Sequence, residues 1–69
     1  MRIKYYFNGN YLIKGVKLFG YIVGKVLYSS TAVFKPGERV KVKSETFSEV
    51  SSEMVKTLKD FGYLSSLEL

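Results

Sequence analysis

Gly15-Val-Lys-Leu-Phe-Gly-Tyr-Ile-Val-Gly-Lys-Val-Leu-Tyr28 is the stretch on which the fold of this chain depends. It is rich in β-branched and aromatic residues, which favour strands, and glycines interrupt it at positions 15, 20 and 24. A helix would lose roughly 1 kcal/mol at each interior glycine relative to alanine. We therefore predict strands here, with the glycines at bulges or bends of a strongly curved sheet.

The same region also fits an amphipathic helix. At about 100° per residue, Lys14, Lys17 and Lys25 share one arc, while Val16, Val23 and other apolar residues fill the opposite arc. A basic amphipathic helix over residues 11–28 would lie at a membrane interface. An apolar face of this size is more often buried against the protein's own sheet, so we prefer strands.

The residues before this region predict a β-hairpin. Arg2–Phe7 alternates, with Ile3, Tyr5 and Phe7 on one side and Arg2, Lys4 and Tyr6 on the other. Asn8-Gly9 follows, and a second β-prone run occupies 10–14. Asn-Gly between two such runs predicts a type I′ turn, because that turn needs a positive φ at both central residues.

The residues after this region predict a turn between two further strands. Ala32–Phe34 reads as a short strand, and Lys35-Pro-Gly-Glu38 as a type II turn, since Pro presets φ and Gly supplies the positive φ. Arg39–Lys43 alternates strictly, with Val40 and Val42 facing the core and the three cations facing solvent.

A helix is predicted over about 46–61. Thr46 and Glu49 form a capping-box pattern, followed by a single apolar stripe at helical spacing. Gly62 fits the C′ position beyond the helix, and residues 64–69 either add a short strand or fray. The stripe consists of Phe47, Val50, Met54, Leu58 and Phe61.

Together these elements predict one small α+β domain over residues 1–69. We expect a curved antiparallel sheet, or a partly open SH3-like barrel, packed by the C-terminal helix. The expected core comprises Ile3, Tyr5, Phe7, Leu12, Val23, Val26, Phe34, Val40, Val42, Phe47, Val50, Met54, Leu58 and Phe61.

Charge is divided along the chain. Residues 1–43 carry nine Lys/Arg against one acid, a balance of +8, whereas residues 44–69 carry two Lys against five acids, a balance of −3. A sequence pI of about 9.6 favours polyanions or acidic protein surfaces as partners.

The basic half suggests a surface for nucleic acid. Cations on a sheet face displace phosphate counterions, and tyrosines among them offer rings on which exposed bases stack. The alternative is an ordinary solvated face, on which lysines discourage edge-to-edge pairing. The candidate nucleic-acid-binding residues are Arg2, Lys4, Tyr6, Lys17, Tyr21, Lys25, Arg39, Lys41 and Lys43.

The composition argues against an enzyme, a metal site and a cofactor. Cys and His are both absent, so the usual transition-metal ligands and nucleophile–base pairs are missing. The acidic side of the predicted helix reads as an ordinary solvated helix face. We expect no signal peptide and no membrane-spanning helix, because residues 1–7 lack a leader pattern and lysines interrupt the most apolar window. The expected location is the cytoplasm, or the host cytoplasm if the protein is viral.

Residues 20–64 resemble a pattern of short phage-type proteins. In those proteins a β-hairpin with a Lys-Pro-Gly-Glu-type turn is followed by a strand, a helix and a terminal Gly-aromatic step. The segment Phe34-Lys-Pro-Gly-Glu-Arg-Val40 is also similar to turns that lead into strands of SH3-like barrels. The resemblance implies an accessory or host-interaction protein, with no catalytic residues to transfer.

Two functions follow as hypotheses. The first is a non-enzymatic module that binds nucleic acid through the basic sheet face without strong sequence specificity. The second is a phage-type protein that binds another protein, through its basic face or a free strand edge. A homo-oligomer is compatible with either hypothesis.

Overall fold

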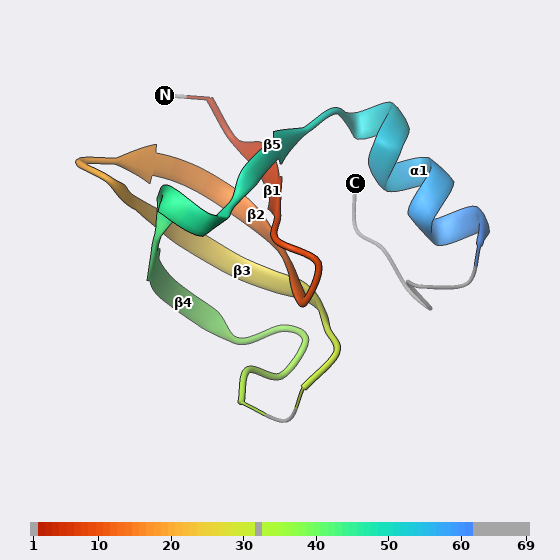
Figure 1. The fold of residues 1–69 in the computed structure, drawn as a ribbon, viewed down its shortest axis with the longest axis horizontal. Helices are drawn as coiled ribbons and strands as arrows, with labels where there is room; N and C mark the ends of the chain where they lie inside the picture. The colour runs from red at the N-terminus through yellow and green to blue at the C-terminus, as the bar shows by residue number, and fades with distance from the viewer. Residues whose placement is uncertain (1, 32, 62–69) are drawn as a thin grey trace.

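The computed structural model describes residues 2–31 and 33–61. Within these residues, five strands form one antiparallel sheet in the order β4-β3-β2-β1-β5, and one α-helix follows it (Figure 1). This confirms the predicted α+β class with its C-terminal helix. The elements are β1 (Lys4–Phe7), β2 (Tyr11–Leu18), β3 (Tyr21–Ser29), β4 (Arg39–Lys43), the 3₁₀ helix η1 (Ser44–Thr46), β5 (Ser48–Val50) and α1 (Ser52–Asp60).

Residues 15–28 are strands, as predicted, and the alternative helix over 11–28 is wrong. A tight turn, which the sequence analysis does not predict, joins the two strands. The turn consists of Phe19 and Gly20, whose φ angles are 50° and 81°. Positive φ at both central residues is the type I′ geometry, and its twist matches that of the flanking strands. The stretch therefore forms the end of β2, the turn and most of β3.

The first hairpin is also present, but its turn lies one residue later than predicted. Gly9 and Asn10 are the central residues, because the Asn8 N–H donates to the Tyr11 carbonyl at 3.2 Å. Among the described residues 8–10 only Gly9 has a positive φ, of 91°, which fits a type II′ turn and not type I′. The Asn8 side chain explains the shift, since its Oδ1 accepts the N–H groups of Asn10 and Tyr11.

The connection from β3 to β4 matches the prediction in part. The type II turn is confirmed, because Gly37 has a φ of 91° and the Glu38 N–H donates to the Lys35 carbonyl at 3.0 Å. The short strand predicted at 32–34 is wrong in its described part, since residues 33–34 are bends. Phe34 instead packs edge-on against Tyr11, with ring centroids 5.2 Å apart.

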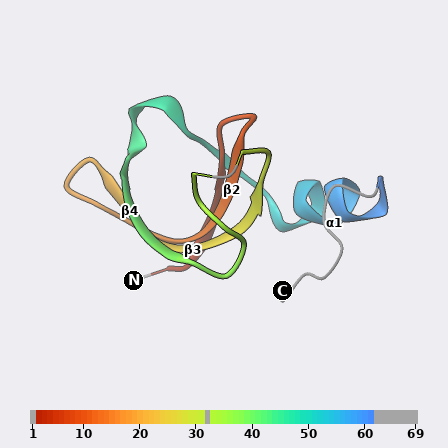
Figure 2. The same cartoon turned by 90° about the horizontal axis from the view of Figure 1, so that it is seen from below.

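The sheet curls strongly, so that its strands wrap around an interior (Figure 2). Gly15 of β2 stands directly opposite Gly24 of β3. A β-carbon on Gly15 would lie 2.1 Å from the Val23 carbonyl oxygen, and one on Gly24 would lie 2.3 Å from the Lys14 carbonyl oxygen. The two backbones therefore approach at a point where neither strand has room for a side chain. This is the bend that the glycines of the stretch predict.

The inner face of the curled sheet carries the main core. Tyr6, Ile13, Ile22 and Val26 are buried there. Tyr6, only 6% exposed, was predicted to face solvent; this is wrong, because β1 is covered on both of its faces. The partly buried residues around this core are Tyr11, Phe34, Val40, Val42 and Phe47.

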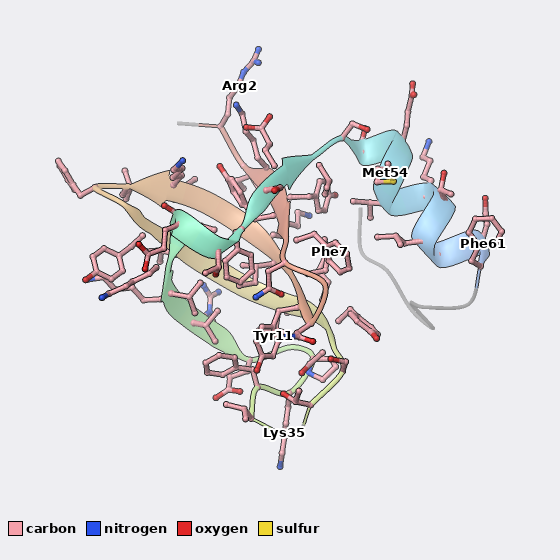
Figure 3. All side chains as sticks on the ribbon, in the orientation of Figure 1. Arg2, Phe7, Tyr11, Lys35, Met54 and Phe61 are labelled. Atoms are coloured by element: carbon pink, nitrogen blue, oxygen red, sulfur yellow. The ribbon has the colours of Figure 1, made fainter. Side chains whose placement is uncertain are left out.

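A second, smaller core lies on the outer face of the sheet, under α1. Leu12 of β2 and Val55 of α1 are fully buried and belong to one hydrophobic cluster. Figure 3 shows Phe7 on the side of the sheet that meets α1. The partly buried residues of this outer core are Tyr5, Phe7, Leu27, Tyr28, Val50 and Leu58.

The helix begins at Ser52 and not at Thr46. The predicted capping box is wrong, because Thr46 ends η1 and Glu49 lies in β5, opposite Tyr6 of β1. Pairing with β1 gives the backbone of Ser48–Val50 the hydrogen bonds that a first helical turn would otherwise supply. The actual N-cap is Ser51, whose Oγ accepts the Met54 N–H at 3.2 Å.

The late helix start also changes which residues are buried. Within the described helix, Val55 is buried, although the predicted stripe did not include it. The predicted C′ residue, Gly62, and residues 64–69 lie outside the described residues. Core residues of the prediction that are exposed instead are Ile3, Val23, Met54 and Phe61.

Gly15→Ala should lower the free energy of unfolding by at least about 3 kcal/mol, because the new methyl group would displace backbone of β3. Gly20→Ala is the matched control: no atom lies within 4 Å of its β-carbon position, so that only the positive φ opposes it. The control should lose about 1 kcal/mol. Urea denaturation of both variants measures the difference, and equal losses would contradict the close approach of the two strands.

Val55→Ala should lower the free energy of unfolding by about 2 kcal/mol, because it removes buried methyl groups and leaves a cavity beneath α1. Its neighbour Met54 is half exposed, so that Met54→Ala should change stability by less than about 0.5 kcal/mol. Thermal or chemical unfolding distinguishes the two variants. A larger loss from Met54→Ala would mean that α1 docks through a different face.

Candidate nucleic-acid interface

The strand register gathers cations from β2, β3 and β4 on the outer face of the sheet. Residues opposite each other in antiparallel strands share a face, and successive residues alternate between faces. Lys14 stands opposite Lys25, and Lys25 stands opposite Arg39. Lys41 and Lys43 follow Arg39 on the same side of β4. We call this surface the outer basic face: Lys14, Tyr21, Lys25, Arg39, Lys41 and Lys43.

Four of these cations, Lys25, Arg39, Lys41 and Lys43, are exposed, and Lys14 is half-buried. The row of Lys14, Lys25 and Arg39 places like charges on three adjacent strands spaced about 4.8 Å apart. Like charges in directly opposed positions destabilise a sheet.

No acid occupies an outer-face position of the described strands. Glu49 is the one acid within them, and it stands opposite Tyr6, on the inner side. The face is therefore uniformly positive along its strands. The remaining acids of the described residues lie in turns or helices: Glu38, Glu45, Glu53 and Asp60.

Tyr21 adds an aromatic ring to this face. It stands opposite Lys43, and its ring centroid lies 5.1 Å from the Lys41 Nζ. This distance is within the range of about 6 Å over which a cation attracts the face of an aromatic ring. Tyr21 is 36% exposed, so part of the ring is available to a ligand.

The predicted residues of β1 do not join the outer basic face. Lys4 is opposite Gly15, Gly15 is opposite Gly24, and Gly24 is opposite Val40, so these four residues share one face. Val40 packs against the inner core, so Lys4 is on the inner side of the sheet. Lys4 instead forms an ion pair with Glu49, with its Nζ 3.2 Å from Oε1. Tyr6 is buried, and Arg2 points away from the sheet ahead of β1 (Figure 3). The side of β1 that carries Lys4 therefore does not align with the cations of β4.

Lys17 is exposed but also lies on the other side of β2. It stands opposite Ile22, which belongs to the inner core. Its place near the end of the strand puts it close in sequence to the Phe19-Gly20 turn. Lys17 is thus at the rim of the sheet and not within the outer basic face.

The structure also places apolar residues on this face that the sequence analysis did not assign to it. Val16 and Val23 are opposite each other, and Leu18 is opposite Tyr21. Val23 is 41% exposed. Placing a two-residue turn at Phe19-Gly20 would have predicted this arrangement, because the turn fixes which residues of β2 and β3 are opposite each other.

A pocket of about 300 Å³ lies at one end of the outer basic face. It is lined by the tip of the β2–β3 hairpin, the end of β4 and the start of η1. Two hydrogen bonds hold these segments together: the backbone N–H and the Oγ–H of Ser44 both donate to the Gly20 carbonyl, at 2.9 and 3.0 Å. The lining residues are Gly20, Tyr21, Lys43, Ser44 and Glu45.

Neither a metal-binding cluster nor a membrane-spanning helix is present in the described residues. In residues 2–31 and 33–61, no group of three or more acidic, His or Cys side chains could hold a metal ion. Over that same part of the chain, no helix is long and apolar enough to cross a membrane.

No protein-family model, curated protein or solved structure matches the chain significantly.

Proposed function

We propose that this protein is a non-enzymatic module that binds nucleic acid through the outer basic face. The observation that carries the proposal is the register of β2, β3 and β4, which places Lys14, Lys25, Arg39, Lys41 and Lys43 on one surface. Acids are absent from the outer-face positions of the described strands. A polyanion is the ligand that complements a face with this arrangement of cations.

The phosphate backbone is the natural ligand for such a surface. Each cation that neutralises a phosphate releases counterions, and this gain does not depend on base sequence. Along β4, cations on the same face repeat every second residue, about 6.8 Å apart. The face can therefore contact successive phosphates of an extended strand, with the Tyr21 ring beside them for base stacking.

The triple variant Arg39→Glu, Lys41→Glu and Lys43→Glu tests this proposal. Fluorescence anisotropy with labelled single- and double-stranded DNA and RNA should show binding by the parent protein. If every cation of the face contacts one phosphate, the logarithm of affinity should fall with the logarithm of salt concentration at a slope of up to about −3.5 for single strands. The triple variant should lose at least about tenfold in affinity and have a slope shallower by about 2.

A matched control separates this face from net charge. Lys35→Glu, Lys56→Glu and Lys59→Glu produce the same change in net charge at exposed residues elsewhere. Lys35 lies in the loop between β3 and β4 (Figure 3). Lys56 and Lys59 lie on α1. The control should retain most of its affinity. An equal loss in both triple variants, or no binding by the parent protein at low salt, would contradict the proposal.

A second candidate function is binding to another protein as a phage-type accessory module, and the position of β4 favours it. This strand is at one edge of the described sheet. The Glu38 carbonyl accepts the Val26 N–H at 2.8 Å, so alternation turns the backbone groups of Arg39, Lys41 and Lys43 away from β3. A partner strand could add to this edge. Stable homo-oligomers with no affinity for polyanions would favour this function.

We also assign the curled sheet to the SH3-like class of partly open barrels. This assignment is supported by the path of the chain. After the meander from β1 to β4, the chain bends at η1, and β5 pairs with β1 at the other side of the sheet. The two edge strands of the described sheet, β4 and β5, are therefore joined to each other by a short segment that contains η1.

A further inference from the structure

The tip of the β2–β3 hairpin combines two features that are costly for a free protein. Phe19 has a φ of 50°, in the left-handed region that bulky residues rarely occupy. Its side chain is also 98% exposed, the highest value among the large exposed apolar residues of the described chain. A strained backbone that presents an apolar ring to solvent is typical of a binding site.

The tip is held in place by the rest of the sheet. Leu18 and Tyr21 close the turn as an opposed pair. The Gly20 carbonyl accepts two hydrogen bonds from Ser44, one from its N–H and one from its Oγ–H. These bonds fix the tip against the start of η1, so that the aromatic residue is presented by an ordered turn.

The pocket beside the tip offers the groups that recognise a base. Tyr21 supplies a ring on which a base can stack, and Lys43 supplies a cation for the adjoining phosphate. Glu45 supplies a carboxylate, which accepts hydrogen bonds and donates none. The hollow, of about 300 Å³, is open to solvent, so that a planar base can lie against its lining residues.

We infer that this end of the outer basic face is a subsite for an unpaired base of a single-stranded nucleic acid. Phe19 and Tyr21 stack on bases, Lys43 contacts phosphate, and Glu45 accepts a hydrogen bond from an exocyclic amino group. Cytosine, adenine and guanine carry such an amino group on their pairing edge, whereas thymine and uracil carry none and present two carbonyl oxygens beside their ring N–H. The subsite therefore favours single strands over duplexes, and bases with an exocyclic amino group over thymine or uracil. This inference rests on the function proposed above.

The test measures fluorescence anisotropy with three probes: oligo-dC and oligo-dT of about 12 nucleotides and a mixed-sequence duplex of the same length. The parent protein should bind oligo-dC more tightly than oligo-dT. Phe19→Gly removes the ring and adopts the positive φ without strain, so the variant should keep or raise its melting temperature. It should lose about 5- to 150-fold in affinity for both single strands, with duplex affinity unchanged within about twofold.

Glu45→Gln tests the base preference separately. The amide can donate to the thymine carbonyl as well as accept from the cytosine amino group. The ratio of the oligo-dC and oligo-dT affinities should therefore move toward one, while the duplex affinity changes little. An unchanged ratio would overturn the role of Glu45.

The remaining outcomes separate this inference from the proposed function. Failure of the parent protein to bind any probe would overturn the proposed function and the inference together. Equal binding to all three probes, with no effect of Phe19→Gly, would overturn the subsite and leave the outer basic face in place. If Phe19→Gly bound all probes normally but lost binding to vesicles of phosphatidylcholine and phosphatidylserine, the tip would be a lipid contact and the inference would be wrong.

Discussion

The approach of Gly15 to Gly24 is the constraint from which the rest of this fold follows. Carbonyl oxygens of the opposite strand lie near the points where β-carbons would be, so these positions accept only glycine without a backbone shift. The resulting bend lets a short chain curl its sheet around an interior (Figure 2). A flat sheet of this length would leave one face of most strands in water, and few residues remain to cover it.

The outer surface of the sheet has two different ends. Toward the first hairpin, Leu12, Phe7 and Tyr28 pack under α1 and form the outer core. Toward the Phe19-Gly20 turn, the described structure places no helix over the sheet, and the outer positions carry the cations with Tyr21 and Val23. Residues on one face of continuous strands therefore serve two purposes, as core under α1 and as open surface beyond it. Strand register alone decides which residues belong to each.

The sequence predicts those parts of the fold that depend on local chemistry. Pro36-Gly37 and the alternation of Arg39–Lys43 are fixed by the residues themselves, and both are confirmed. The start of α1 was missed because Phe47 and Val50 fit a helical stripe equally well, and only pairing with β1, far away in the chain, selects the strand. Tyr6 was misplaced because alternation cannot identify the solvent side of a strand that is buried on both faces. For the candidate site, the cations of β4 were predicted, whereas the place of Lys4 depended on a register that the sequence does not reveal.

Features that lower the stability of a free protein are informative when several occur at one end of the molecule. Lys14, Lys25 and Arg39 are opposed like charges, and the outer face shows Val23 and part of Tyr21 to solvent. Phe19 combines a left-handed backbone with a fully exposed ring. The exposed apolar area and the backbone strain each oppose stability, by different mechanisms. The inner core, by comparison, obeys the ordinary rules of burial, and no polar side-chain atom of the described residues is buried there without a partner. Proteins commonly combine a well-packed interior with destabilising features at a functional surface. A surface with several such features beside a well-packed core is therefore expected of a binding site.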